Sequence, residues 1–143
     1  EILLEKATEL GVKEIHPIIM ERSVKTSINI DRCNKILISA AKQCRRSFFP
    51  ILHAPKDLKT LLNSNKGCKY YACHLDADLN LFSYKGTLTY PSNVIIGPEG
   101  GFSKTEIDTM ENSGVLFFHL GNRRLRAETA AISSITLFNE LGL

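Results

Sequence analysis

The stretch "NVIIGPEGGFSKTEID", residues 93–108, joins an apolar run to the start of a helix through a loop with three glycines. Residues 93–97 have the short, β-branched composition of a buried strand, and residues 103–114 have the pattern of a helix. Ser103 and Glu106 stand at capping-box spacing, in which each side chain bonds the backbone N–H group of the other residue. The stretch therefore predicts a strand–loop–helix unit whose helix begins at Ser103 or one residue later.

The loop that follows this strand has the composition of a turn that exposes its backbone. Pro98 fixes the turn, and Gly100 and Gly101 can adopt positive φ and let a ligand approach closely. It is not a phosphate cradle, because Lys104 is out of register for a Walker loop and Glu99 interrupts the dinucleotide-binding pattern and would repel a phosphate. A neutral or cationic ligand, such as a nucleoside that carries a sulfonium and an ammonium group, fits Glu99 better. A tight turn without a ligand is the alternative.

Helices and strands alternate along the rest of the chain. Helical patterns run over residues 2–10, from 31 to before Pro50, over 55–62 and from 128 onward, and strand patterns over 12–20, 69–75 and 115–121, with an irregular connection over 76–92. Parallel neighbours need long crossovers, so this order predicts an α/β fold with a mostly parallel sheet and helices on both faces. In such sheets ligands bind outside the carboxyl ends of the strands. We therefore expect the ligand at the two glycine-bearing strand ends, Gly97–Gly101 and Gly121.

Length and composition limit the class of protein. The chain has 143 residues, of which 43% are apolar, which predicts one globular domain over residues 1–143. No apolar run approaches the roughly 20 residues of a membrane span, and the first residues lack the features of a signal peptide, so we expect a soluble, cytoplasmic protein. The chain starts at Glu1, already inside a helical pattern, which indicates a piece of a longer protein.

The four cysteines and four histidines show no metal-binding spacing. There is no C-x-x-C pair and the histidines stand singly, so we predict no metal site and reduced, structural cysteines. Cys44 lies among apolar residues and is expected to be a small buried hydrophobe.

Two stretches concentrate positive charge on a chain whose formal net charge is +3. In "HLGNRRLRAETAA", residues 119–131, the arginines lie between a strand end and a helix start, and arginine is the residue suited to bidentate phosphate contacts. Glu128 fits either a site role or the favourable placement of an acid in the first turn of a helix. Such clusters suit an anionic partner, although a solvated charged face is the alternative.

The second basic stretch is "AAKQCRRSFFP", residues 40–50. Gln43 and Arg46 share a helix face, and charge beside Phe48 and Phe49 is a combination that suits single-stranded or looped RNA. Packing of the two phenylalanines in the core is the alternative that we favour from the sequence.

Five stretches in the same order resemble the family of small-subunit ribosomal RNA uridine-N3 methyltransferases, which belongs to the SPOUT class. They are "KATELGV" at 6–12, "IHPIIMERSV" at 15–24, "AAKQCRRSFFP" at 40–50, "IGPEGGFSKTEI" at 96–107 and "LGNRRLRAETA" at 120–130. The resemblance covers nearly the whole chain. It departs from the family pattern at Lys42, Arg124 and Ala127, where a glutamate, an aliphatic residue and a threonine are usual.

The resemblance implies a SPOUT catalytic domain with a C-terminal trefoil knot, a homodimer, and a missing N-terminal PUA-like RNA-binding domain. It implies methylation of uracil N3 in 16S ribosomal RNA of the small ribosomal subunit, at uridine 1498 in the family. It also implies S-adenosylmethionine in the knot, against residues Leu75, Gly97, Pro98, Glu99, Gly100, Gly101, Leu120, Gly121, Leu125 and Arg126.

Methyl transfer to N3 requires alignment and stabilisation of the anion that forms when N3 loses its proton. We expect Arg126 to stabilise that anion, with Arg22 and Arg46 as further candidates and Glu128 as a weak candidate base. The residues expected to contact RNA are Arg22, Gln43, Arg45, Arg46, Arg123 and Arg124. Two alternatives stay open: a SPOUT enzyme that methylates a ribose 2'-hydroxyl, and an inactive RNA-binding or ribosome-assembly protein.

Overall fold

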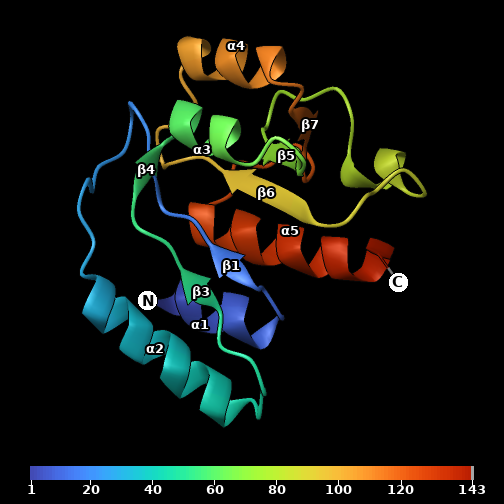
Figure 1. Cartoon of the computed structure of the whole chain (residues 1–143). Coiled ribbons are helices and arrows are strands. Elements are labelled where there is room, and N and C mark those ends of the chain that lie inside the picture. The colour runs from blue at the N-terminus through green and yellow to red at the C-terminus, as the bar shows by residue number, and fades with distance from the viewer. Residues whose placement is uncertain (143) are drawn as a thin grey trace.

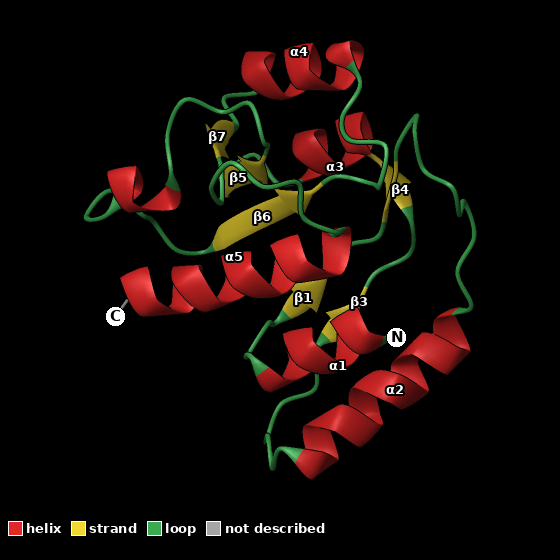
Figure 2. Cartoon of the chain, turned by 180° about the vertical axis from the view of Figure 1, so that it is seen from behind, coloured by secondary structure: helices red, strands yellow, loops and turns green. Residues whose placement is uncertain are grey.

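The computed structural model describes residues 1–142 and contains five α-helices, one 3₁₀ helix and seven strands (Figures 1 and 2). The helices are α1 (Ile2–Glu9), α2 (Ile30–Gln43), α3 (Leu58–Ser64), η1 (Leu81–Tyr84), α4 (Lys104–Asn112) and α5 (Ala127–Gly142). The strands are β1 (Glu14–Ile15), β2 (Ile18–Ile19), β3 (Ile51–Leu52), β4 (Lys56–Asp57), β5 (Lys69–Cys73), β6 (Ser92–Ile96) and β7 (Leu116–Phe118). Within residues 1–142, no helix is both long enough and apolar enough to cross a bilayer.

A three-stranded parallel sheet lies at the centre of the C-terminal half. Its order is β6-β5-β7, so the chain moves from β5 to one neighbour and then returns past β5 to the other side. The register pairs Cys73, the last residue of β5, with Ile96 on one side and Phe118 on the other. All three strands therefore end at the same level, which confirms the predicted parallel sheet and sets its carboxyl edge.

The two faces of this sheet bury two different clusters, because successive side chains of a strand point to opposite faces. Tyr70 and Ala72 of β5 pack with leucines of α3 and with Met110 of α4. Tyr71 packs on the other face, with residues that include Phe138 of α5. Figure 1 shows α3 and α4 on one side of the sheet and α5 on the other, so the prediction of helices on both faces is confirmed.

The predicted strand over residues 12–20 is wrong in one respect, since it is two short strands. β1 pairs in parallel with β3, and β2 pairs in parallel with β4. Pro17 lies between β1 and β2; it has no N–H to donate, although its carbonyl accepts a 3.1 Å hydrogen bond from the backbone N–H of Lys56. The N-terminal layer is completed by α1, which packs against both α2 and α5.

Two further predictions about the chain path need correction. The connection over residues 76–92, expected to be irregular, contains η1, whose Leu81 is only 1% exposed, and Asn80 forms a bridge with His119. The short helix expected over 55–62 begins later, at Leu58, because Asp57 caps it by accepting a hydrogen bond from the N–H of Thr60. The trefoil knot stays a prediction.

Three side chains expected in the core lie at the surface. Phe48 is 79% exposed and Phe49 is 51% exposed, and Cys44 is exposed as well. All four cysteines are free, as expected. The α2 pattern still buries Leu37, Ala40 and Ala41, so the error is confined to the residues after the helix, where periodicity gives no information.

Candidate active site

Three loops leave the carboxyl edge of the central sheet and enclose a cavity of about 400 Å³. They follow β5 at residues 74–76, β6 at 97–102 and β7 at 120–125. The order β6-β5-β7 places the point where the chain reverses direction at β5, and ligands of open α/β sheets bind at such points. The cavity volume lies within the range of small-molecule sites.

The glycine loop after β6 is a tight turn with little freedom. The N–H of Gly101 donates a 2.8 Å hydrogen bond to the carbonyl of Pro98, and Gly101 has φ +75°. Gly100 does not adopt the positive φ expected of it, so its role in the loop is a different one. A Cβ atom at Gly100 would lie 3.0 Å from the Cβ of Arg22, so glycine is required there for close approach of another segment.

That other segment is the turn at residues 20–23, which is fixed to the glycine loop at two points. The Nη1 of Arg22 donates to the carbonyl oxygens of Gly100 at 3.0 Å and Phe102 at 3.3 Å. The carboxylate of Glu106 accepts one 2.8 Å hydrogen bond from the N–H of Glu21 and another from the N–H of Ser103. The predicted capping box is therefore confirmed, and its glutamate also binds a distant turn.

The arginines of the loop after β7 take different positions. Arg124 donates from Nη2 to the carbonyl of Glu99 at 3.3 Å, and Arg123 lines the cavity. Arg126 and Glu128 are exposed, lie at the start of α5 and are not among the residues that line the cavity. The carbonyl of Arg126 accepts a 2.9 Å hydrogen bond from the N–H of Ala130, so its backbone belongs to the first turn of the helix.

The structure brings together most of the residues expected to contact the methyl donor. The cavity is lined by Leu75, Gly97, Pro98, Glu99, Gly100, Gly101, Leu120, Gly121 and Leu125, and also by Arg22, Arg123 and Arg124. The sequence interpretation missed His74, Asp76, Phe102 and Ile107, which line it too. His74 and Asp76 follow directly after β5, so the rule that sites lie beyond strand ends could have found them.

The cavity combines apolar walls with two exposed carboxylates, Asp76 and Glu99. Both acids attract a cationic group, and Arg22, Arg123 and Arg124 add positive charge to the same cavity. Cys73 also lines the cavity, and burial raises the pKa of its thiol, which disfavours the thiolate. The thiol is therefore a wall of the cavity and not an activated nucleophile.

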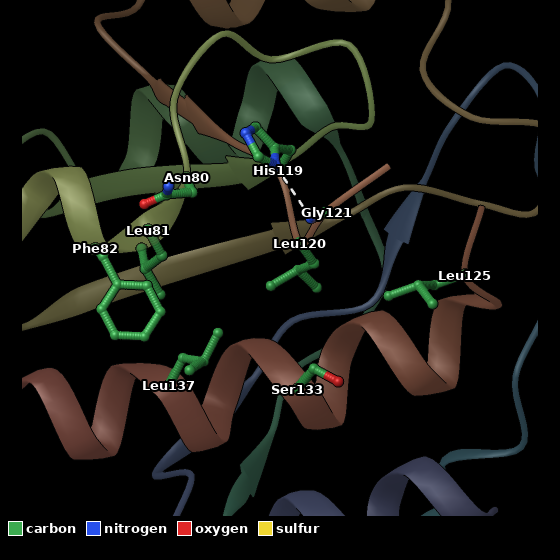
Figure 3. A pocket seen from close by; sticks show the side chains of 9 residues that line it. All are labelled: Asn80, Leu81, Phe82, His119, Leu120, Gly121, Leu125, Ser133 and Leu137. Carbon is green, nitrogen blue, oxygen red and sulfur yellow. Dashed lines mark hydrogen bonds between the residues drawn. The ribbon is translucent and has the colours of Figure 1, made fainter. Parts of the chain in front are cut away.

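A second cavity of about 350 Å³ lies on the other side of the loop after β7 (Figure 3). Leu81 and Phe82 of η1 and Ser133 and Leu137 of α5 line it, and Leu120, Gly121 and Leu125 line both cavities. His119 supports the shared loop, because its Nδ1 accepts a 3.0 Å hydrogen bond from the N–H of Gly121. This places Nδ1 as the unprotonated nitrogen of the ring.

The residues of the 40–50 stretch lie apart from the cavity. None of Gln43, Arg45 and Arg46 lines it. The Nη1 of Arg46 donates to the carbonyl oxygen of Thr8, in the last turn of α1, at 2.7 Å and to that of Val12, beyond the helix, at 3.3 Å. Arg46 thus holds α1 and the end of α2 together.

One group of side chains has the composition of a metal site. The ligand atoms of Glu14, His16 and His53 lie within 4.8 Å of one another. The two imidazole rings stack with centroids 4.0 Å apart and an interplanar angle of 8°, so their in-plane lone pairs lie in nearly parallel planes and do not meet at one point. Glu14 Oε2 lies 2.8 Å from His53 Nε2 and 3.3 Å from His16 Nε2, an arrangement that satisfies a carboxylate without a metal.

Comparison with known proteins identifies the family. A family model described as an RNA methyltransferase domain matches residues 1–139. The chain belongs to this family. Curated relatives confirm its resemblance to the ribosomal RNA methyltransferases.

Several curated proteins named ribosomal RNA small subunit methyltransferase E are similar to this chain. The protein of Rickettsia conorii is 31% identical over 99% of this chain, and that of Mesomycoplasma hyopneumoniae is 34% identical over 95%. This chain spans 59% and 62% of those two relatives, so it corresponds to part of their length.

Two solved structures bound to S-adenosylmethionine have the same fold. The small subunit methyltransferase E of Neisseria gonorrhoeae has a TM-score of 0.86 at 27% identity, and the match covers 98% of this chain and 60% of that one. A Legionella pneumophila protein solved with the bound cofactor has a TM-score of 0.85 at 31% identity, over 97% of this chain and 60% of that one. The α/β fold of this family is therefore the fold of this chain.

Proposed function

We propose that this chain is the catalytic part of an S-adenosylmethionine-dependent enzyme that methylates uracil N3 in 16S ribosomal RNA. The observation that carries the proposal is the cavity of about 400 Å³ formed where β5, β6 and β7 end, built by the three loops that the family resemblance assigns to the methyl donor. Membership of the RNA methyltransferase family and the names of the relatives support the RNA substrate.

The residues present fit the methyl donor. Apolar side chains such as Leu75, Leu120 and Leu125 offer a surface for a nucleoside base, and Asp76 and Glu99 offer negative charge for its cationic groups. S-adenosylmethionine supplies an electrophilic methyl group on a sulfonium. The glycine loop, held by Arg22 and Arg124, presents backbone groups to the donor in a fixed arrangement.

The chain's own residues have a limited chemical task. The uracil must be aligned with the methyl group and the charge on N3 stabilised as its proton leaves, and a preorganised cation serves both needs. Arg126 remains our first candidate for this role from the resemblance. Arg22 and Arg123 line the cavity directly, so they are the competing candidates. Bulk water can accept the proton, and we assign no general base.

The organisation of the whole protein is also part of the proposal. The relatives are longer than this chain, which supports an additional RNA-binding domain, of the PUA-like type that the resemblance implies. We further propose a cytoplasmic homodimer that acts on the small ribosomal subunit without a metal ion.

Two measurements test the proposed function. Calorimetry with S-adenosylmethionine and its demethylated product is expected to show one donor per chain, and the absence of heat with both would refute every enzymatic interpretation. Mass mapping of 16S RNA from cells that lack the full-length protein is expected to show loss of a methyl group from one uracil. Loss from a ribose, with every uracil mark intact, would identify a 2'-hydroxyl methyltransferase instead. Donor binding with no lost mark would indicate a protein of ribosome assembly.

A further inference from the structure

One segment of the chain contains basic residues and no acidic ones. Between Arg32 and Lys56 there is no aspartate or glutamate, although the chain as a whole has 15 acidic residues against 18 basic ones. The basic residues of this segment are Arg32, Lys35, Lys42, Arg45, Arg46 and Lys56. α2 and the turn that follows it therefore carry five basic residues against one acidic residue, Asp31.

The helix presents part of this charge along one face. Arg32, Lys35 and Lys42 are spaced at intervals of three and seven residues, which places them on the same side of a helix, and all three are exposed. The opposite side buries Leu37, Ala40 and Ala41 against the domain. Arg32 is paired with the carboxylate of Glu1, and the exposed Asp31 lies one turn before Lys35 and offsets part of its charge. The remaining charge of this face is carried by Lys42 and, in part, by Lys35. They lie about 10 Å apart along the helix, at 1.5 Å per residue.

The turn after the helix adds two exposed aromatic rings. Phe48 is 79% exposed and Phe49 is 51% exposed, and Arg45 beside them is exposed and has φ +56°, a conformation that non-glycine residues rarely adopt. Arg46 holds the turn in place through its hydrogen bonds to the carbonyl oxygens of Thr8 and Val12, and Pro50 is buried. The turn is thus anchored on one side while its phenylalanines face outward.

We propose that α2 and this turn form a surface that binds unpaired RNA, separate from the methyl-donor cavity. Lys35, Lys42 and Arg45 contact phosphates, and one or two unpaired bases stack on Phe48 and Phe49. Cationic residues that lead to exposed aromatic rings are the combination that single-stranded nucleic acid requires. The inference rests on the proposed function for RNA as the substrate class, but it uses none of the residues that line the cavity.

The positive charge of this surface favours RNA over a second copy of the chain as its partner. A second copy of this chain, placed on the surface by a two-fold axis, would bring the same basic residues face to face at a cost in repulsion. A polyanion such as RNA gains binding free energy at these basic residues, because counterions are released when they contact phosphates. Figure 1 shows α2 at the edge of the molecule opposite α4, where a long partner has free access.

The aromatic part is tested with Phe48→Ala/Phe49→Ala, measured by fluorescence anisotropy on an unstructured RNA oligonucleotide and on an RNA duplex. Both side chains are largely exposed, so the variant should fold; far-ultraviolet circular dichroism checks this. We expect the affinity for the unstructured RNA to fall roughly 5- to 150-fold for each base that stacks, and the affinity for the duplex to change little. The matched control is Phe82→Ala, a phenylalanine that is 59% exposed and lies outside the surface.

The charged part is tested with Lys35→Gln/Lys42→Gln against the control Lys59→Gln/Lys66→Gln, whose lysines are exposed elsewhere. The slope of log affinity against log salt should decrease by roughly 1.4 in the first variant, at about 0.7 for each phosphate contact to a single strand, and stay constant in the control.

The proposal is overturned if the test and control variants have equal effects on RNA affinity, or if the chain does not bind RNA. A loss of dimer mass on sedimentation of the phenylalanine variant would assign the surface to a second copy and overturn it too. Donor calorimetry is independent of these outcomes, so failure of this surface and failure of the proposed function are distinguishable.

Discussion

Arg22 and Gly100, 78 residues apart in the chain, are joined by a 3.0 Å hydrogen bond from the guanidinium Nη1 to the glycine carbonyl. The same Nη1 lies 3.3 Å from the carbonyl of Phe102. The guanidinium therefore holds the end of the glycine loop at two positions on either side of Gly101. Because these carbonyl oxygens are fixed, the N–H groups of the loop are fixed as well, and a donor meets a preorganised surface.

The close approach of Arg22 to Gly100 makes Gly100→Ala a direct test of that surface. A Cβ atom there would lie 3.0 Å from the Cβ of Arg22, so either the loop or the turn at 20–23 must shift. We expect affinity for S-adenosylmethionine to fall on the order of tenfold, the loss of about one hydrogen bond to a charged group. Calorimetry measures this against Gly67→Ala, where a Cβ atom meets nothing within 4 Å. Equal affinity of the two variants would show that the loop is not held by this contact.

Glu99 is expected to recognise the positive charge of the donor. The carboxylate is exposed at the cavity and its backbone carbonyl is bonded to Arg124, so Glu99→Gln removes charge while the turn is kept. We expect weaker binding of S-adenosylmethionine with a smaller effect on the demethylated product, which lacks the sulfonium. Titration of both ligands into the variant and into Asp76→Asn measures the difference. An equal loss for both ligands would make Glu99 a residue that shapes the turn only.

Arg126→Ala should separate chemistry from binding. If Arg126 stabilises charge on the uracil, turnover by the full-length enzyme should fall on the order of 100-fold, as for removal of one hydrogen-bond donor that stabilises a transition state. The affinity for S-adenosylmethionine should be kept. Single-turnover methylation of small-subunit RNA measures the rate, with Arg123→Ala as the comparison because Arg123 lines the cavity. A larger loss in Arg123→Ala than in Arg126→Ala would transfer the role to Arg123.

Local signals in the sequence predicted the elements that local interactions decide. Ser103 and Glu106 gave the start of α4 because the capping box lies within four residues, and alternation of helices and strands gave the parallel sheet. The single strand predicted over 12–20 is wrong because Pro17 separates β1 from β2, since proline cannot donate to a ladder. The expectation that Phe48 and Phe49 pack in the core is wrong, because only tertiary packing decides which side of a turn is covered.

The site was predicted in part for the same reason. Glycines and arginines at strand ends form recognisable patterns, so the loops after β6 and β7 were found. His74 and Asp76 carry no such pattern; their position directly after a strand is the signal that could have found them, and the pairing of β5 with β6 and β7 brings that strand end to the site. The contacts of Arg22 and Arg46 with distant carbonyl groups are products of the fold and have no local signal.

The Glu106 carboxylate should contribute more stability than an ordinary helix cap. Ser103→Ala removes one side-chain bond at the start of α4 and is expected to cost about 1 kcal/mol of unfolding free energy. Glu106→Ala leaves the N–H groups of both Ser103 and Glu21 without their partner, so it should cost more. Urea denaturation gives both values, with Glu111→Ala on the exposed side of the same helix as control. A smaller cost for Glu106→Ala than for Ser103→Ala would contradict the double role.

His16 is expected to make the stability of the domain depend on pH just below neutrality. Burial, followed by the neighbouring His53, lowers the pKa of His16 from its ordinary value of 6.5; Lys56 acts in the same direction and Glu14 in the opposite one. As pH falls through 6.5, the unfolded chain binds a proton at His16 while the folded chain does not, so the free energy of unfolding decreases until the lower, folded-state pKa is reached. Urea denaturation between pH 8 and pH 5 should show this decrease, and His16→Asn should reduce its slope. A slope that is the same in the variant would assign the pH dependence to other groups.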